Sequence, residues 1–344
     1  MSQPGFWDWE ERQTKLNQKK DLLVRLNEII PWEAFRPLLE QIHDKPRKSN
    51  AGRKAIDVVV MFKLLVVQQL YNISDEELEY QVSDRLSFMQ FMGFGLADEV
   101  PDATTVWLFR KQLSEQGLIE SLFEQFDDYL IEQGYAAKGG QIVDATLIPV
   151  PKQHNSDKEN EQLKRGQIPQ DWQDKPHRFA QKDTDARWTK KGDKSYFGYK
   201  DHIGIDAEHG LIRRYVVTDA SVHDSQVLGQ LLDEDNDSDA IWADSAYRAQ
   251  AIEETLELMG FESQIHERAY RKHPLNQEQK QANRTKSITR ARVEHVFGCW
   301  TMQMGGKFVR SIGLVRAKAY LGLKNLTYNF MRYTFLETQV VHSS

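Results

Sequence analysis

The chain has 344 residues, 40% of them hydrophobic and 28% charged, a composition typical of a soluble globular protein with one large or two smaller domains. No apolar run approaches roughly 18 residues, and the start lacks the basic-then-apolar order of a signal peptide. The single Cys299 excludes both an internal disulfide framework and a cysteine-rich zinc site. We therefore expect a cytoplasmic protein without a membrane partner. The net charge of −6 argues at first against a nucleic-acid partner. Residues 264–320, however, hold 12 Lys and Arg against 3 Asp and Glu. This local excess indicates either a basic surface for a polyanion or, equally, a solvated basic face.

The first third of the chain has helical patterns. We assign residues 1–50 to a polar, helical N-terminal extension and residues 51–135 to a helical domain. Residues 55–71 form a dense apolar helix. Ser74, with Glu77 three residues later, is a capping-box pattern that opens a second helix.

A further helix is predicted after Asp102, with Val106, Phe109 and Leu113 at helical spacing. A helix of this kind at the end of a compact helical domain suits a helix-turn-helix reader of DNA. A plain helical bundle is the alternative, and the pattern alone favours it. In the helix-turn-helix interpretation the DNA contacts are the polar and basic residues off the apolar stripe, namely Thr104, Thr105, Arg110 and Lys111.

Strand patterns begin after residue 140. We expect strands at 141–150, 196–206, 211–220, 240–248 and 261–268, and helices at 222–234, at 251–260 and from about 285 onward. The polar stretch 152–195 is an insertion within this second domain, assigned to residues 136–336. A hairpin followed by alternating helices and strands predicts an α/β fold with a mixed sheet and flanking helices.

Two of these strands carry a carboxylate in an apolar setting. Asp144 interrupts the core of the first strand, and Asp244 ends the strand that begins at residue 240. A buried, unpaired carboxylate costs several kcal/mol, roughly, unless a partner such as a metal compensates it. Two strands of one sheet can bring both side chains to one metal. A strand-end cap or a paired structural acid is the alternative for each.

Glu294 is the third candidate, because it is an acid inside the most basic segment of the chain and lies one helical turn after Arg290. The alternative is an ordinary Arg–Glu pair on a helix surface. Three carboxylates without a Cys or His cage favour Mg²⁺ or Mn²⁺. Two such ions can activate an attacking oxygen and stabilise the leaving one in phosphodiester displacement.

Other side chains near these acids are candidates for holding phosphates or supporting the metal ligands. For Tyr247 a packing role is equally expected, and a histidine is more often structural or phosphate-facing than a ligand. The phosphate candidates are Arg248, Arg290, Arg292 and Lys307, and the supporting candidates are Tyr247, His223 and His295.

Several segments together resemble a known family. They are LSFMQFMGFGLADEVPDATTVWLFRKQL (86–113), VDATLIPV around Asp144, DARWTKKGDKSYFGYKDH (185–202), VTDASVHDSQ (217–226), WADSAYR (242–248) and RARVEHVFG (290–298). In this order, over most of residues 50–335, they resemble bacterial insertion-sequence transposases of the DDE type, in the group named after insertion sequence 5.

The resemblance implies a ribonuclease H-like catalytic domain preceded by an all-α domain, with Asp144, Asp244 and Glu294 as the metal-binding triad. Related transposases often carry a Tyr-x2-Arg-x3-Glu-x6-Lys signature. Arg290 and Glu294 fit it, but Ser287 stands at the Tyr position and Thr301 at the Lys position. Lys307 is the candidate substitute for the missing Lys.

These observations lead to the hypothesis of a DNA transposase that binds terminal inverted repeats, cleaves at the element ends and joins the 3′-OH to target DNA with Mg²⁺ or Mn²⁺. Two DNA ends must meet, so we expect at least a homodimer in the active complex, at the bacterial nucleoid. The alternatives are a metal-dependent nuclease without strand transfer and a catalytically dead DNA-binding regulator.

Overall fold

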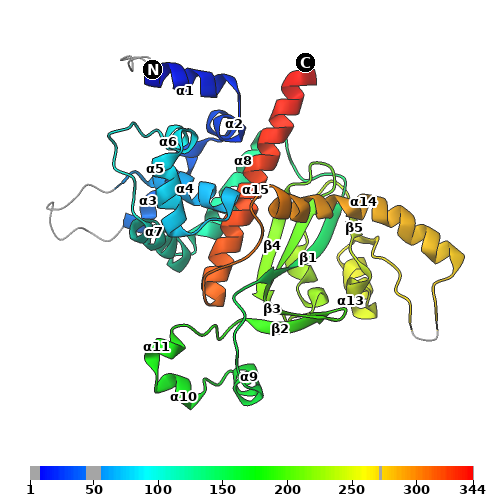
Figure 1. The fold of residues 1–344 in the computed structure, drawn as a ribbon. Coiled ribbons are helices and arrows are strands. Elements are labelled where there is room, and N and C mark those ends of the chain that lie inside the picture. Colours follow the sequence, from blue (N-terminus) through cyan, green and yellow to red (C-terminus); the bar gives the residue numbers. More distant parts are fainter. Residues whose placement is uncertain (1–7, 44–55, 271–272, 344) are drawn as a thin grey trace. The chain divides into compact units, whose positions relative to one another are not determined.

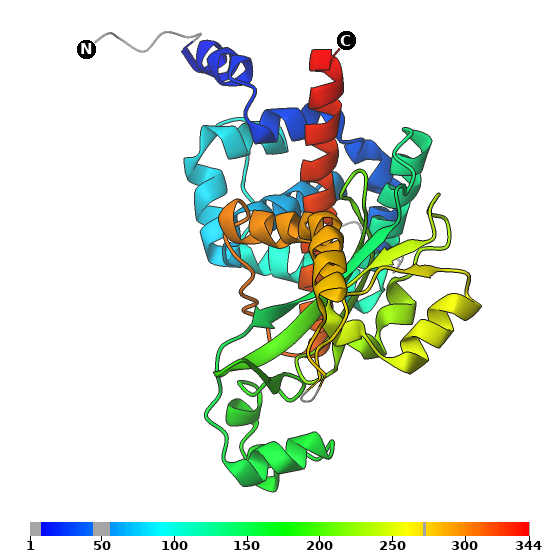
Figure 2. The ribbon, with the colours of Figure 1, turned by 90° about the vertical axis from the view of Figure 1, so that its right-hand side faces the viewer.

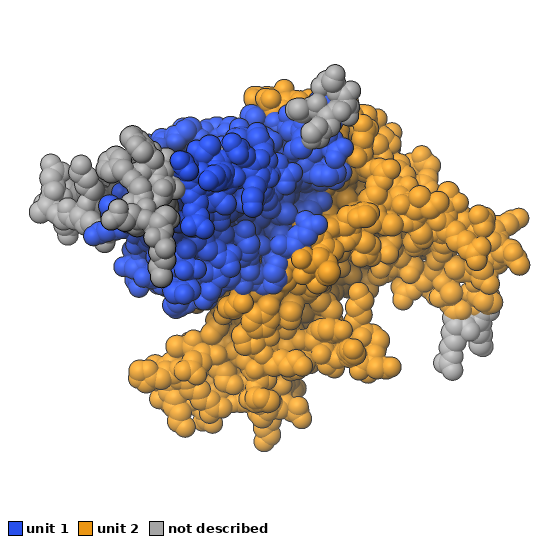
Figure 3. All heavy atoms as spheres, turned by 45° about the horizontal axis from the view of Figure 1, so that its top comes forward, with its two compact units in different colours: residues 1–130, 303–305, 323–344 blue, residues 131–302, 306–322 orange. Residues whose placement is uncertain are grey.

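The computed structural model describes residues 8–43, 56–270 and 273–343, so the ends of the predicted extension, 1–7 and 44–50, lie outside the described residues. The chain divides into two compact units, which Figure 3 colours separately. Unit 1 comprises Met1–Leu130, Gln303–Gly305 and Leu323–Ser344, and unit 2 comprises Ile131–Met302 and Gly306–Gly322.

The described part of unit 1 is built from helices (Figure 1). Ser74 accepts a hydrogen bond from the Glu77 amide at 3.1 Å and Asp102 from the Thr105 amide at 2.6 Å, which confirms both predicted helix starts. The helices are α1 (Asp8–Gln18), α2 (Leu22–Ile29), η1 (Trp32–Phe35), α3 (Arg36–Glu40), η2 (Gln41–His43), α4 (Val58–Tyr71), α5 (Asp75–Asp84), α6 (Leu86–Met92), α7 (Ala103–Glu115), α8 (Leu118–Glu132) and the later part of α15 (Leu314–Ser343).

Aromatic side chains form the centre of unit 1. The ring of Phe330, on α15, lies 4.6 Å from that of Phe126 and 5.5 Å from that of Trp32, and Phe35 packs on Phe62 at 5.3 Å. Almost all of α4 is buried. Within the described ranges no single helix is long and apolar enough to cross a membrane, although α4 and α5, bent by 102°, pass that test as a pair.

Unit 2 contains a mixed sheet of six strands in the order β2-β3-β1-β5-β6, with β4 also paired to β3. β1 is antiparallel to β3 and parallel to β5, so the predicted mixed sheet is confirmed. Gly140 precedes β1 with a φ of +86°, and a Cβ there would lie 2.5 Å from the Ala240 carbonyl oxygen. The strands are β1 (Gln141–Pro149), β2 (Arg187–Lys191), β3 (Lys194–Asp206), β4 (Ile212–Asp219), β5 (Ala240–Trp242) and β6 (Glu262–Ser263).

The helix predicted at 222–234 is wrong in length, because only the short turns η3 (Asp224–Gln226) and α12 (Leu228–Leu231) form. The buried amide of Gln141 stops it. Its Nε2 donates to the Asp233 carbonyl at 2.7 Å and its Oε1 accepts from the Asp233 amide at 2.9 Å. The strand predicted at 240–248 is also shorter, because Asp244 starts a 3₁₀ turn, η4 (Ser245–Tyr247).

The polar insertion 152–195 is ordered around Trp172, which is fully buried. Its indole N–H donates to Glu159 at 2.7 Å, and the ammonium of Lys182 lies 4.8 Å from the ring. The insertion contains α9 (Asp157–Lys164), α10 (Gln170–Gln173), α11 (Pro176–Phe179) and the strand β2.

Helices flank the sheet of unit 2. Residues of α12 join an apolar cluster with Val143 of β1, Ile241 of β5 and Leu256 of α13 (Gln250–Leu258). The long helix α14 (Gln277–Met302) packs on β1 and β5 (Figures 1 and 2). It begins eight residues earlier than the predicted position of about 285.

Candidate active site

The sheet register places Asp144 and Asp244 on neighbouring strands. Ile142 of β1 pairs with Trp242 of the parallel strand β5, and each acid follows two residues later. Because parallel strands advance together, the two carboxylates leave the same end of the strand pair side by side. Asp244 also caps η4, accepting the Ala246 amide at 2.7 Å.

Helix α14 adds Glu294, and Arg290 connects it to Asp144. The Arg290 guanidinium donates to Asp144 Oδ2 at 2.7 Å and lies 3.7 Å from Glu294 Oε1. The Asp144 side chain is 14% exposed and that of Glu294 is 59% exposed. The helix is fixed by an apolar stripe that faces the sheet, namely Val293, Val296, Phe297 and Trp300.

The electrostatics of Asp144 are those of a carboxylate short of positive charge. Its pKa is raised to about 6 in the folded chain. Burial is the largest cause, the charges of Asp244 and Glu294 also raise the pKa, and Arg290 lowers it. Arg290 therefore compensates Asp144 only in part, and a further cation beside Asp144 would be favourable.

The donor chemistry suits a hard divalent cation, since all three side chains offer carboxylate oxygens. As the side chains stand, no three His, Cys, Asp or Glu residues of the described chain converge closely enough to hold a metal ion. The Arg290 guanidinium contacts both Asp144 and Glu294. A bound cation would replace that contact.

Lys307 extends the positive charge along β1. Its ammonium donates to Thr146 Oγ1 at 2.5 Å, two residues beyond Asp144. Burial lowers the pKa of Lys307, the charge of Lys191 lowers it further, and that of Glu294 raises it. Lys307 thus lies beside the acids, where the sequence predicted a phosphate contact.

Arg248 and Arg292 are engaged within unit 2. Arg248 pairs with Glu253 at 2.8 Å and with Glu267 at 2.9 Å, and Arg292 donates to the carbonyl of Ala207. The phosphate contacts predicted for these two arginines stay predictions. A bound phosphate would compete with the internal bonds of each guanidinium.

Tyr247 lies fully buried behind the acids, in the apolar cluster that includes Val143. Its hydroxyl meets no hydrogen-bond partner among the residues that the structure describes. Burial raises its pKa, and the charges of Asp224, Asp144 and Asp244 raise it further. The structure thus brings Tyr247 close to the acids, and its supporting role stays a prediction.

The predicted histidines are solvent-facing. His223 Nδ1 contacts Ser225 Oγ at 2.7 Å and accepts the Ser225 amide at the start of η3, while His295 is exposed on α14. No contact in the described structure connects either side chain to the acids.

A second polar group lies near Tyr247, and the sequence did not predict that its members meet. Lys200 donates to Asp224 at 2.8 Å, and the buried His202 lies 3.8 Å from the same carboxylate and contacts Thr218 at 2.9 Å. Burial lowers the pKa of His202 to about 4, so this histidine is neutral at pH 7. The motifs YFGYKDH and VHDSQ contain these residues. They come together because β3 pairs with β4, which leads directly into the second motif.

In unit 1, helix α7 divides its polar residues between interior and surface. Arg110 forms a bidentate pair with Asp75 at 2.8 and 2.7 Å and also binds Gln68 at 2.6 Å. The DNA contact predicted for Arg110 stays a prediction, and forming it would break this pair. Thr105 is half-buried next to the helix cap, Asp102. The exposed residues of α7 include Thr104, Trp107, Leu108 and Lys111.

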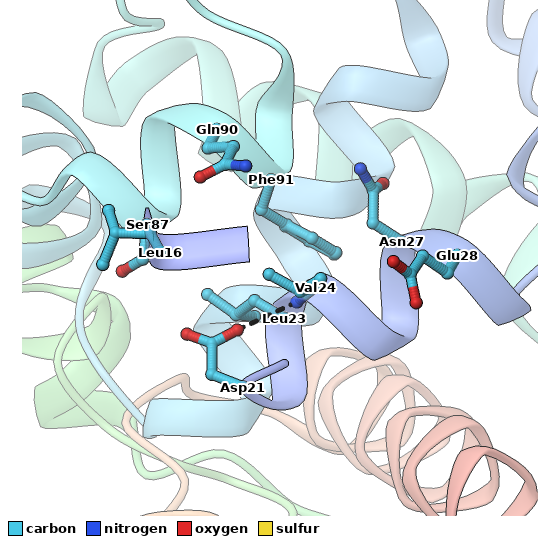
Figure 4. A pocket seen from close by; sticks show the side chains of 9 residues that line it. All are labelled: Leu16, Asp21, Leu23, Val24, Asn27, Glu28, Ser87, Gln90 and Phe91. Carbon is cyan, nitrogen blue, oxygen red and sulfur yellow. Dashed lines mark hydrogen bonds between the residues drawn. The ribbon is translucent and has the colours of Figure 1, made fainter. Parts of the chain in front are cut away.

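Unit 1 also contains a pocket of about 300 Å³, formed by α1, α2 and α6 (Figure 4). Apolar side chains such as Val24 and Phe91 line it together with the polar Asn27 and Glu28. The carboxylate of Asp21 accepts a hydrogen bond from the Val24 amide at 3.0 Å. None of the three acids of unit 2 lines this pocket.

Replacing Tyr247 by Phe is expected to leave the free energy of unfolding unchanged or to raise it by up to about 1 kcal/mol, because the lost hydroxyl is buried without a described partner. Urea unfolding measures this. Tyr199→Phe is the matched control, since the Tyr199 hydroxyl donates to both oxygens of the buried Asp183 at 2.8 Å and its loss should cost about 1–3 kcal/mol. Equal losses in both variants would contradict the assignment of Tyr247 as unpartnered.

Comparison with known proteins gives two family matches. Residues 135–330 match the profile of the transposase DDE domain, and residues 10–112 match that of a transposase domain designated DUF772. Among solved structures, the chain is similar to a piggyBac transposase synaptic complex with hairpin DNA, determined by cryo-EM. The identity is 11% and the TM-score 0.46, over 92% of this chain and 75% of that chain. The first family match spans more than half of the chain and contains Asp144, Asp244 and Glu294.

Proposed function

The chain belongs to the transposase DDE domain family, and we propose that it mobilises an insertion sequence of the group named after insertion sequence 5. In this proposal it binds the terminal inverted repeats, cleaves the DNA at the element ends and joins each 3′-OH to target DNA. Both steps use the site around Asp144, Asp244 and Glu294.

The observation that carries the proposal is the arrangement of these three acids. Two of them leave neighbouring parallel strands, and Arg290 links the third to Asp144 from helix α14. Three carboxylates, of which Asp144 is only partly compensated, beside the partly buried ammonium of Lys307 suit a reaction at a phosphodiester, which brings negative charge and needs cations.

We assign unit 2 to the ribonuclease H-like fold. The sheet order supports this, because the first strand lies between an antiparallel hairpin, β3–β4, and two parallel strands, β5 and β6. The first acid of the set then lies on the central strand and the second at the end of its parallel neighbour.

Asp144, Asp244 and Glu294 would hold the divalent ions, Mg²⁺ or Mn²⁺ and two in number, that this family generally uses. When bound, such ions activate the attacking oxygen and stabilise the leaving one. Arg290 and Lys307 would hold phosphate oxygens next to the acids. The apolar packing of Tyr247 and Val293 keeps bulk water away from the inner side of the site.

The helices of unit 1 would form an all-α domain that reads the terminal repeats. The exposed polar face of α7, with Thr104 and Lys111, supports this assignment, and so does the match of residues 10–112 to a transposase domain. Because two element ends must meet, the active complex would hold at least two copies of the chain, acting on cytoplasmic, nucleoid DNA.

The test is an assay with Mg²⁺, a DNA that carries the element's own terminal repeat, and a target plasmid. The wild-type chain is expected to cleave at the repeat and to yield joined product. Glu294→Gln should lower both products by roughly a thousandfold or more, as removal of a central catalytic group does. Repeat binding, measured by fluorescence anisotropy, should persist.

Glu278→Gln is the matched control, since Glu278 is exposed in the first turn of the same helix, about four turns before Glu294. Cleavage without joining by the wild-type chain would replace the proposal by a nuclease. Binding of the repeat without cleavage, unchanged in Glu294→Gln, would replace it by a DNA-binding regulator.

A further inference from the structure

The β2–β3 hairpin carries three lysines at its tip. Lys190, Lys191 and Lys194 flank a two-residue turn in which Gly192 has a φ of +59°, as the first position of such tight turns requires. All three lysines are exposed, and none forms an ion pair with a residue that the structure describes. With the exposed Asp193 in the turn, the three lysines give the hairpin tip a net charge of +2, which it presents to solvent.

Two of these lysines oppose each other directly. Lys191 and Lys194 are cross-strand partners, so their side chains lie on the same face of the hairpin. Like charges directly opposite one another destabilise a strand pair. Trp188, three pairs of positions further back and on the opposite face with Lys190, is 40% exposed and packs on its cross-strand partner Phe197 with ring centroids 5.2 Å apart. The repulsion between the two opposed lysines is relieved when a polyanion binds across them.

The hairpin is continuous with the acidic site. Lys191 is near enough to Lys307 to lower its pKa, and Lys307 donates to Thr146 on β1. The segment that carries Lys307 is bound to the end of β1, because the Val309 amide donates to the Pro149 carbonyl at 3.1 Å. Positive charge thus runs from the hairpin tip through Lys307 to the place where Asp144 and Glu294 lie.

We propose that the β2–β3 hairpin binds the phosphates of duplex DNA next to the scissile bond and so holds the substrate strand across the acids. This rests on the proposed function and adds to it a second contact surface, separate from the helices assigned to repeat recognition. The interaction is with the backbone, because lysine ammonium groups are point charges that neutralise phosphates without reading base edges.

The experiment compares the full-length wild-type chain with the triple variant Lys190→Ala/Lys191→Ala/Lys194→Ala. Binding of a fluorescent DNA duplex of arbitrary sequence is measured over a series of NaCl concentrations. Each phosphate contact contributes about 0.9 to the slope of log K against log salt, so the triple variant should lose about 2–3 from that slope. Its melting temperature should not fall, because a like-charge pair has been removed.

A charge-matched control, Lys158→Ala/Lys164→Ala/Lys175→Ala, removes three exposed lysines of unit 2 that lie outside the basic segment 264–320. Its slope should stay within about 1 of the wild-type slope. An unchanged slope in the hairpin variant, or an equal fall in the control, overturns the hairpin proposal while leaving cleavage and joining intact. No salt-dependent DNA binding by the wild-type chain overturns the hairpin proposal and the proposed function together.

Discussion

Replacing Asp144 by Asn is expected to abolish strand cleavage and, at the same time, to make the folded chain more stable at pH 7.5. The loss of activity should be roughly a thousandfold or more, because Asn offers a neutral donor where the proposed site needs a charged one. The gain in stability follows from burial. The ionised carboxylate is unfavourable where it lies, as its pKa of about 6 indicates.

The pH dependence fixes the sign of this prediction. The folded-state pKa of Asp144, about 6, lies above the ordinary aspartate value of 3.8, so the folded chain binds this proton more tightly than the unfolded chain does. The stabilising contribution is present below about pH 4 and is lost as the pH rises through about 6. About two pKa units correspond to about 3 kcal/mol, which is the upper limit of the gain in the Asn variant at pH 7.5. Loss of the Arg290 pair reduces that gain.

Urea unfolding at pH 5.0 and pH 7.5, together with the cleavage assay, measures both effects. Asp128→Asn, an exposed aspartate on α8, is the control and should change neither quantity. An Asp144→Asn variant that loses more than about 1 kcal/mol at pH 7.5 would show that Asp144 is a structural ion-pair partner of Arg290. Retained cleavage would remove Asp144 from the site.

Asp206→Ala is expected to destabilise unit 2 by about 3–5 kcal/mol, because it leaves the buried guanidinium of Arg213 without its carboxylate. Asp206 is fully buried and accepts from the amides of His209 and Leu211 as well as from Arg213. The residue thus closes the turn between β3 and β4. A loss of this size is a large part of the stability of an ordinary domain.

The effect should reach the active site through the same turn. Arg292 of α14 donates to the carbonyl of Ala207, directly after Asp206, so the helix that carries Arg290 and Glu294 is anchored there. Thermal unfolding and hydrogen exchange of α14 would measure both consequences. Asp206→Asn keeps an acceptor oxygen and should lose less stability. If the Ala variant loses no more than about 1 kcal/mol, the turn does not depend on this charge.

Local patterns predicted much of the fold. The caps at Ser74 and Asp102, the strand around Asp144 and the buried stripe of α14 follow from residues close together in sequence. The helix predicted at 222–234 failed because Gln141, more than 90 residues away, binds the backbone of Asp233 and ends the helical turn. A tertiary hydrogen bond of this kind leaves no periodic trace in the sequence.

The candidate site was predictable in its residues but not in its connections. The acids stood out because carboxylates are rare in apolar strands. The contact of Arg290 with Asp144 spans 146 positions, and sequence spacing predicted only its neighbour on the helix, Glu294. The contact of Lys200 and the buried His202 with Asp224 was not predicted, because it depends on the pairing of β3 with β4 and on the turn that follows β4.

The membership of α15 in the core of unit 1 has a consequence for synthesis of the chain. Phe330 is fully buried and packs against Trp32, Phe35, Phe62 and Phe126, all of which leave the ribosome long before it. Domains usually fold in order as they emerge, the first one first. Here the first helices wait for the end of unit 2 before their core is filled. A nascent chain that stops early therefore lacks a finished helical unit, and the capacity to fold stably and the capacity to act on DNA arise together, late in translation.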